Sequence, residues 1–191
     1  RTIESIKNND KIGIFGDYDV DGATSTALLG KYFDHLDVAY KTYIPDRKTE
    51  GYGPSIKGFK ELIDYGVKII FTVDCGTLSF DAIEYAKNKK IDVIILDHHQ
   101  SEINLPKAYS IVNPNRIDDK SNLQYLCAVG VSFMFLVSLN KSLRSVQWFE
   151  KKNKSEPNLL NYLDLVSLGT VCDVVPLVGL NRALVKQGLK I

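Results

Sequence analysis

The sequence predicts an α/β fold of the Rossmann-like type, a mainly parallel β-sheet flanked by helices and followed by a helical C-terminal section. Over residues 1–115, short runs rich in Val and Ile alternate with longer segments of helical character. Strands separated by helices of this length are typical of a parallel sheet that is covered on both faces. From Leu123 onward the pattern is helical only, so we expect an α/β core over residues 1–115 and a helical section over residues 116–191.

The expected strands are short, largely apolar runs that stop at a glycine, a proline, an aspartate or an Asn-Pro pair. Buried strands of a parallel sheet have this continuous apolar character, whereas half-exposed strands alternate between apolar and polar residues. The set consists of Lys11–Phe15, Val38–Ile44, Lys68–Val73, Asp92–Leu96 and Ser110–Val112.

The expected helices occupy the intervals between these strands and most of the C-terminal section. Ser55–Tyr65 is followed by Gly66, a common residue at helix ends. Tyr125–Leu139 is apolar on nearly every side, which indicates a buried helix. Two segments are expected to be loops, the Gly/Pro-rich stretch Asp46–Pro54 and the lysine-rich connector Lys141–Asn158. The expected helices are Ala23–Phe33, Ser55–Tyr65, Ser79–Asn88, Tyr125–Leu139, Leu159–Leu168 and Asn181–Leu189.

Composition excludes several classes of protein. The chain is 45% hydrophobic and 25% charged, which is typical of a globular protein, and its apolar runs are too short to span a membrane. Three separated cysteines argue against a disulfide framework or a zinc knuckle and favour the reducing cytoplasm. The net charge of +1 gives no overall attraction to nucleic acid, so such contacts require local patches or metal ions. Because Arg1 is not a natural start, we expect the chain to be part of a longer protein.

Acidic residues and histidines follow three of the expected strands. The runs are GDYDVDG at residues 16–22, DCG at residues 74–76 and DHH at residues 97–99. Ligands of open parallel sheets bind in the crevice beyond the carboxyl ends of the strands. We therefore expect these side chains to meet at one edge of the sheet.

The three alternating aspartates of residues 17–21 predict a metal site. Crowded carboxylates raise one another's pKa unless a cation neutralises them. Carboxylate and imidazole ligands together suit Mn²⁺, with Mg²⁺ as the alternative. For Asp74 or Asp81 taken alone, capping of the following helix is an equally good explanation.

Two other families with a DxD spacing fit less well. A calcium-binding EF-hand loop beginning at Asp17 would have its glycine at Gly22, but it needs glutamate where this chain has Leu28. A phosphatase of the haloacid-dehalogenase type needs Thr or Val two residues after the second aspartate. That place holds Asp21 when the motif is counted from Asp17, and Ala23 when it is counted from Asp19. That family also leaves the DHH run unexplained.

His98 and His99 are two of the three histidines in the chain, and they lie directly after a strand beside Asp97. Adjacent residues at a strand end point in opposite directions. We therefore expect one imidazole to bind metal and the other to face a substrate phosphate, with Asp97 holding one ring by a hydrogen bond.

The motifs resemble those of the DHH phosphoesterase superfamily, and in particular its RecJ branch of single-strand-specific 5′→3′ DNA exonucleases. Phe15 is a departure, because many members carry a histidine there. We expect altered binding of a second metal as a result, and not loss of activity. The matching blocks cover nearly the whole chain in order: GDYDVDGATST (16–26), EGYG (50–53), TVDCG (72–76), ILDHH (95–99), IVNP (111–114), CAVG (127–130), GTVCDVVPL (169–177) and Asn181-Arg182.

The resemblance implies a role for each candidate residue. It implies two bound ions, Mn²⁺ or Mg²⁺, and a catalytic group formed by Asp97, His98 and His99, with His99 touching the scissile phosphate. Arg47, Arg116 and Arg182 are candidates for contacts with backbone phosphates. The implied metal ligands are Asp17 (for the second ion), Asp19, Asp21, Asp74, His98 and Asp173.

The implied function is metal-dependent hydrolysis of single-stranded DNA from its 5′ end, releasing mononucleotides during repair and recombination. In this mechanism a water activated by metal attacks phosphorus. The chain would then be a DHH catalytic domain over residues 1–191, with a DHH-associated domain and an OB-fold lying beyond Ile191. Two alternatives stay open: a DHH enzyme that acts on nano-RNA or small nucleotides, and a non-catalytic replication scaffold.

Overall fold

The computed structural model describes all 191 residues and confirms the predicted fold class. Its centre is a five-stranded sheet in which every neighbouring pair of strands is parallel. The order of strands is β2-β1-β3-β4-β5. Their bounds are β1 (Ile12–Gly16), β2 (Tyr40–Tyr43), β3 (Ile69–Val73), β4 (Asp92–Leu96) and β5 (Ser110–Val112).

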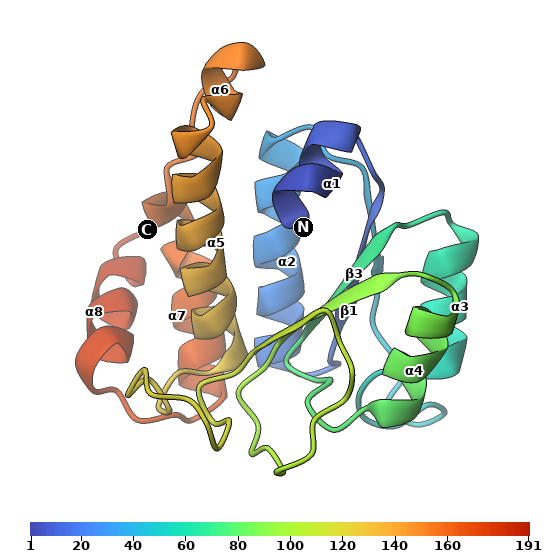
Figure 1. Cartoon of the computed structure of the whole chain (residues 1–191). Helices are drawn as coiled ribbons and strands as arrows, with labels where there is room; N and C mark the ends of the chain where they lie inside the picture. Colours follow the sequence, from blue (N-terminus) through green and yellow to red (C-terminus); the bar gives the residue numbers. More distant parts are fainter.

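Helices cover both faces of this sheet (Figure 1). The helices α2 and α5 pack on one face and α3 and α4 on the other, while α7 packs against α2 and α8 against α7. No helix is both long enough and apolar enough to cross a membrane. The helical elements are α1 (Thr2–Asn8), α2 (Val20–His35), α3 (Ile56–Asp64), α4 (Phe80–Asn88), α5 (Ala128–Ser145), α6 (Trp148–Lys151), the 3₁₀ turn η1 (Leu159–Tyr162), α7 (Leu163–Cys172) and α8 (Gly179–Gly188).

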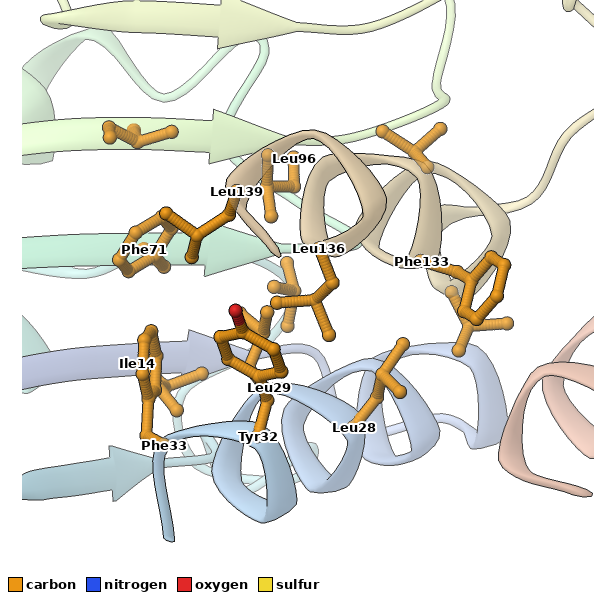
Figure 2. Close-up of a cluster of buried hydrophobic side chains, with 14 of the residues drawn as sticks. Ile14, Leu28, Leu29, Tyr32, Phe33, Phe71, Leu96, Phe133, Leu136 and Leu139 are labelled. Atoms are coloured by element: carbon orange, nitrogen blue, oxygen red, sulfur yellow. The ribbon is translucent and has the colours of Figure 1, made fainter. Parts of the chain in front are cut away.

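The larger apolar core lies between the sheet and the helices α2 and α5. Figure 2 shows Ile14 and Phe71 of the sheet facing Leu29 of α2 and Leu136 of α5. This cluster of 27 buried residues also includes side chains of α7 and α8. The strands and the C-terminal helices therefore share one core, and the division at residue 115 stays a prediction.

A smaller core of 13 buried residues lies on the other face, under α3 and α4. Phe15 occupies its centre, with its ring 5.3 Å from that of Tyr43 and 5.7 Å from that of Phe59. Offset and edge-to-face aromatic pairs of this kind add to the stability that burial gives. Phe15 therefore contributes to packing and offers no ligand atom to the edge of the sheet.

The register of the sheet brings three strand ends to the same level. Gly16 of β1 is paired with Val73 of β3, and Val73 is paired with Leu96 of β4. The next residues along the chain are Asp17, Asp74 and Asp97. Their backbone amides continue the ladder by donating to the carbonyls of Val73, Leu96 and Val112 on the neighbouring strands. Three aspartates therefore lie side by side at the carboxyl edge of the sheet.

The prediction of a solvated connector over Lys141–Asn158 is wrong. Helix α5 continues to Ser145, and the short helix α6 follows at once. Trp148 and Phe149 are only 5% and 4% exposed, and their rings pack edge to face. The lysines dominate the average composition of this segment and conceal the aromatic pair. Two buried residues are nevertheless enough to dock a short helix.

The predicted start of the first long helix at Ala23 is also too late, and α1 is missed entirely. Helix α2 begins at Val20, where the carboxylate of Asp19 accepts a hydrogen bond from the amide of Gly22 at 2.9 Å. This is an ordinary N-cap. An acidic first turn has the composition of a loop, so the sequence pattern places these residues outside the helix.

We expect Trp148→Ala to lower the free energy of unfolding by about 3–5 kcal/mol, because it removes a large buried side chain. The exposed neighbour Lys152 provides the control, since Lys152→Ala should change stability by less than about 0.5 kcal/mol. Urea unfolding of both variants measures the difference. Equal stabilities would show that α6 is not docked.

Candidate metal centre

The centre is built at the carboxyl edge from four segments of the chain: the loop after β1, the end of β3, the end of β4 and the end of α7. Asp17, Asp74 and Asp97 are each only 1% exposed. Asp74 has a left-handed backbone with φ of 61°, an uncommon conformation for a residue other than glycine. Gly76 follows with φ of 113°, and a Cβ there would lie 2.5 Å from Oγ1 of Thr72. The backbone therefore turns sharply directly after β3, at the point where Asp74 contributes its carboxylate to the centre.

Three carboxylates surround the Nε2 atom of His98. It lies 3.3 Å from Oδ1 of Asp74, 3.6 Å from Oδ2 of Asp173 and 3.8 Å from Oδ2 of Asp21. Nε2 is buried and has no hydrogen-bond partner. The two carboxylate oxygens of Asp74 and Oδ2 of Asp173 are also buried without a partner. Buried polar atoms are nearly always paired, so a group of unpaired atoms that face one another fits a bound cation.

A second group of acids adjoins the first through Asp74. Asp17, Asp19 and Asp74 each offer one oxygen, and these oxygens lie within 4.8 Å of one another. Oδ1 of Asp17 is buried without a partner, whereas Asp19 also caps α2. Asp74 belongs to both groups and could be shared between two ions.

The electrostatics of this cluster are unfavourable without a cation. Burial, together with the negative charges of Asp21 and Asp19, raises the pKa of Asp74 to about 10. Burial also raises the pKa of Asp21 to about 6, and it raises those of Asp17 and Asp173. Burial and mutual repulsion favour the protonated forms of such acids unless a nearby positive charge offsets them. Oxygen donors together with one imidazole nitrogen suit Mn²⁺.

Asp21 connects the centre to the helical section. Its Oδ2 accepts from the amide of Ala128 at 2.6 Å and its Oδ1 from that of Val129 at 2.8 Å. These are the first two amides of α5, whose own N-cap residue, Cys127, makes no capping hydrogen bond. A carboxylate is favourable at a helix N-terminus, where unpaired amides and the helix dipole meet. Asp21 thus caps α5 from more than 100 residues away in sequence.

Asp97 differs from Asp17, Asp74 and Asp173, because both of its oxygens are hydrogen-bonded. Oδ1 accepts from the amides of His98 and His99 and from Nδ1 of His99, and Oδ2 accepts from the amide of Thr77. Burial by itself raises the pKa of Asp97, but the hydrogen bonds from His99 and Thr77 outweigh it and lower the pKa to about 2. Asp97 therefore shapes the DHH turn and orients His99, as the sequence predicted for one of the two rings.

The two histidines do not point in opposite directions, so that expectation is wrong. Their ring centroids are 4.7 Å apart, and both rings face Asp74. The reason is that β4 ends at Leu96, so the strand alternation no longer applies when the chain turns around Asp97. His98 is inside the acid cluster, whereas the side chain of His99 is 46% exposed at its rim.

Several residues that hold this geometry were missed by sequence reasoning. The Tyr52 hydroxyl donates to the carbonyl of Asp74 at 3.0 Å and lies 3.0 Å from Nδ1 of His99. Asn113 donates to the carbonyl of His99 at 2.9 Å, and Asn115 to that of His98 at 2.5 Å. The available signal was their position within or beside the EGYG and IVNP blocks. Neutral residues carry no chemical mark of such a positioning role.

The three candidate arginines lie in different settings. Arg47 is exposed, and its guanidinium lies 5.4 Å from the ring centroid of Tyr18. In the sequence, Tyr18 stands between two acids of the first motif. Arg182 is exposed at the start of α8. Arg116 is already engaged, because it pairs with Asp118 at 2.6 Å and donates to the carbonyl of Ile111. Of these three, only Arg47 and Arg182 form no ion pair or hydrogen bond through the guanidinium.

A parallel α/β sheet with two adjoining groups of acids and a histidine at its carboxyl edge defines a domain that can hold divalent cations. Residues 11–170 match the model of the DHH family, N-terminal domain. The chain belongs to this family.

Known relatives within this family are the RecJ proteins. The chain is 40% identical over 187 residues to the single-stranded-DNA-specific exonuclease RecJ of Dickeya dadantii, covering 97% of this chain and 32% of that protein. A crystal structure of exonuclease RecJ bound to manganese matches with a TM-score of 0.82 and 32% identity, covering 98% of this chain and 45% of that one. RecJ of Thermus thermophilus in complex with Mn²⁺ matches at 0.76 and 30% identity, covering 98% and 25%. The chain thus spans less than half the length of these relatives.

We expect the stability of the metal-free protein to fall as the pH rises from about 4 towards neutrality. The pKa of Asp74 is raised to about 10 from an ordinary value of about 3.9, so the native state binds more protons than the unfolded state across this window. Asp74→Asn removes this proton linkage and should flatten the decline. Thermal unfolding in EDTA from pH 4 to 8 measures it, with the exposed Asp81→Asn as the control. A variant whose stability falls as steeply as that of the parent would contradict the assignment.

We also expect Mn²⁺ to bind this chain and to raise its melting temperature, because the ion fills the group of unpaired donors. His98→Ala and Asp74→Ala should each weaken Mn²⁺ binding by at least roughly tenfold. In metalloproteins, a loss of this size follows even when a residue that only hydrogen-bonds to a metal ligand is removed. Isothermal titration of Mn²⁺ is the measurement. His35→Ala, a histidine far from the acids, is the control and should bind as the parent does.

Proposed function

We propose that the protein is a metal-dependent exonuclease that hydrolyses phosphodiester bonds of single-stranded DNA from the 5′ end. The observation that carries the proposal is the group of buried, unpaired donors around Nε2 of His98. A structural core has no use for such a group, and a non-catalytic scaffold would not need to keep it. The similarity to relatives named as single-stranded-DNA-specific exonucleases supports this choice of substrate.

In this proposal the two groups of acids hold two ions, Mn²⁺ or Mg²⁺. Asp21, Asp74, Asp173 and His98 hold one, and Asp17, Asp19 and Asp74 hold the other. The bound cations would supply Lewis-acid stabilisation of the phosphate and make an attacking water more acidic. The structures of RecJ with manganese support the choice of metal.

His99 is proposed to contact the scissile phosphate. Its hydrogen bond to Asp97 raises the pKa of His99, so the ring carries a positive charge over more of the neutral range. Asp97 and Tyr52 fix the position of the ring on one side, while nearly half of the side chain stays exposed on the other. A cationic donor held in this way can stabilise negative charge on the non-bridging oxygens.

Arg47 and Arg182 are proposed to hold backbone phosphates of the strand, because both guanidinium groups are exposed. Arginine presents a planar set of donors that matches phosphate oxygens. A cytoplasmic location is part of the proposal. Three free cysteines, two of them buried, support a reducing environment.

The test is digestion with Mn²⁺ of three substrates: a 5′-phosphorylated single strand, the same sequence as a duplex, and a dinucleotide. We expect mononucleotides from the single strand, with His98→Ala and His99→Ala lowering the rate by roughly 100-fold or more, on the scale seen when one electrostatic donor is removed from an active site. The control His35→Ala should keep the parent rate. Preferential cleavage of the dinucleotide would instead favour an enzyme of small nucleotides.

A further inference from the structure

We propose that the edge of the sheet opposite the metal centre is a second surface that binds single-stranded nucleic acid. We call this surface the basic edge. It is separate from the proposed cleavage site, because its residues precede the strands whereas those of the metal centre follow them. In Figure 1, the basic edge is at the upper end of the sheet, near α1. The metal centre is at the lower end, where the yellow-green loop after β4 begins. The basic edge is defined by Lys11, Tyr65, Lys68, Lys87, Lys107 and Tyr109.

The register of the sheet brings the first two lysines together. Ile12 of β1 is paired with Ile69 of β3, so Lys11 and Lys68 are the residues just before two adjacent strands. The amide of Lys68 donates to the carbonyl of Lys11 at 2.9 Å. Both side chains are exposed, on strands that lie roughly 4.8 Å apart. Lysines that precede neighbouring strands in this way place positive charge at the same end of the sheet.

A hollow of about 170 Å³ continues the basic edge at the start of β4 and β5. Lys87 and Lys107 line it together with Tyr109 and with Asp92, whose carboxylate is paired with Arg1. Ile83 and Val93 form an apolar floor. Tyr109 is 58% exposed, so its ring is accessible to a ligand. A hollow with an apolar floor, a tyrosine ring and two cations offers separate contacts for a base and for its phosphate.

Two acids near the basic edge, Asp92 and Asp10, are paired with Arg1. Arg1 binds Asp92 at 2.5 Å and also approaches Asp10 at 3.7 Å. In contrast, Lys68, Lys87 and Lys107 form no ion pair with any carboxylate of the chain. The whole chain carries a net charge of only +1, so these unpaired lysines are a local excess of positive charge. Such an excess attracts a polyanion through release of its counterions.

The tyrosines identify the class of polyanion. Tyr65 is 44% exposed, and the ammonium of Lys11 lies 4.5 Å from the centre of its ring, while Tyr109 adjoins Lys107. Exposed aromatic rings interleaved with cations are typical of surfaces that stack unpaired bases and hold the backbone between them. The stacked bases of a duplex offer no free face to these rings, so the arrangement favours a single strand.

The experiment measures binding of a fluorescently labelled oligo-dT by anisotropy in EDTA, where no metal ion can hold DNA at the acid cluster. The triple variant Lys68→Glu, Lys87→Glu, Lys107→Glu is compared with Lys31→Glu, Lys141→Glu, Lys152→Glu, which has the same charge change on exposed positions elsewhere. We expect the first to bind at least tenfold more weakly and to lose about 2 from the slope of log Kd against log salt, at about 0.7 per phosphate contact. An equal loss in both triples, or no loss in the first, overturns the proposal.

A second comparison tests the kind of ligand. Tyr109→Ala should weaken binding of oligo-dT by roughly tenfold, the cost of one lost stacking contact, and leave binding of inorganic polyphosphate unchanged. Equal effects on both ligands, or none on oligo-dT, would show a surface for any polyanion and overturn the single-strand assignment. Both comparisons are made in EDTA, where cleavage at the metal centre does not proceed. The basic edge can therefore be tested whether or not the proposed cleavage is found.

Discussion

The parallel register of β1, β3 and β4 is the constraint on which the rest of the structure depends. Because paired residues end the three strands at one level, the next residue of each strand is an aspartate at the same edge. The backbone amides of these aspartates remain in the hydrogen-bond ladder of the sheet, so their positions are set as rigidly as those of the strands. A slip of one residue in any strand would move its acid to the opposite face.

This constraint makes the centre unfavourable in isolation, and the two apolar cores provide the compensation. Four acids with raised pKa values, three of them buried, oppose folding at neutral pH. The surrounding cores contain 27 and 13 buried residues, so the acids cannot spread apart without disturbing packed side chains on both faces. A cluster of acids that lowers the stability of the fold is expected where the residues serve a chemical role.

Much of the fold and of the site could be predicted from the sequence, because strand periodicity and charged residues are visible there. Asp17, Asp74 and His98 follow apolar runs, and their meeting at one edge needs only the rule for parallel sheets. Asp173 was different, because it lies at the end of an apolar helix and only family resemblance pointed to it. Its proximity to His98 is produced by the packing of α7 on α2, which no local pattern encodes.

Two kinds of feature could not be predicted. Asn113 and Asn115 hold the DHH turn through neutral side chains, whose partners depend on how the loop after β5 returns to the sheet. The docking of Trp148 was hidden by neighbouring lysines, because average composition over a segment conceals one or two anchors. Both failures arise from tertiary contacts that override local propensity.

The cap that Asp21 provides for α5 has a consequence for the order of folding. The carboxylate and the amides of Ala128 and Val129 are separated by more than 100 residues, and closing so long a loop is slow. While the chain is being synthesised, the first strands and α2 can form before α5 exists. In that interval Asp21 has neither its helix partner nor Asp173 beside it. Assembly of the acid cluster is therefore a late event, and a growing chain acquires its complete set of donors only once its C-terminal helices have docked.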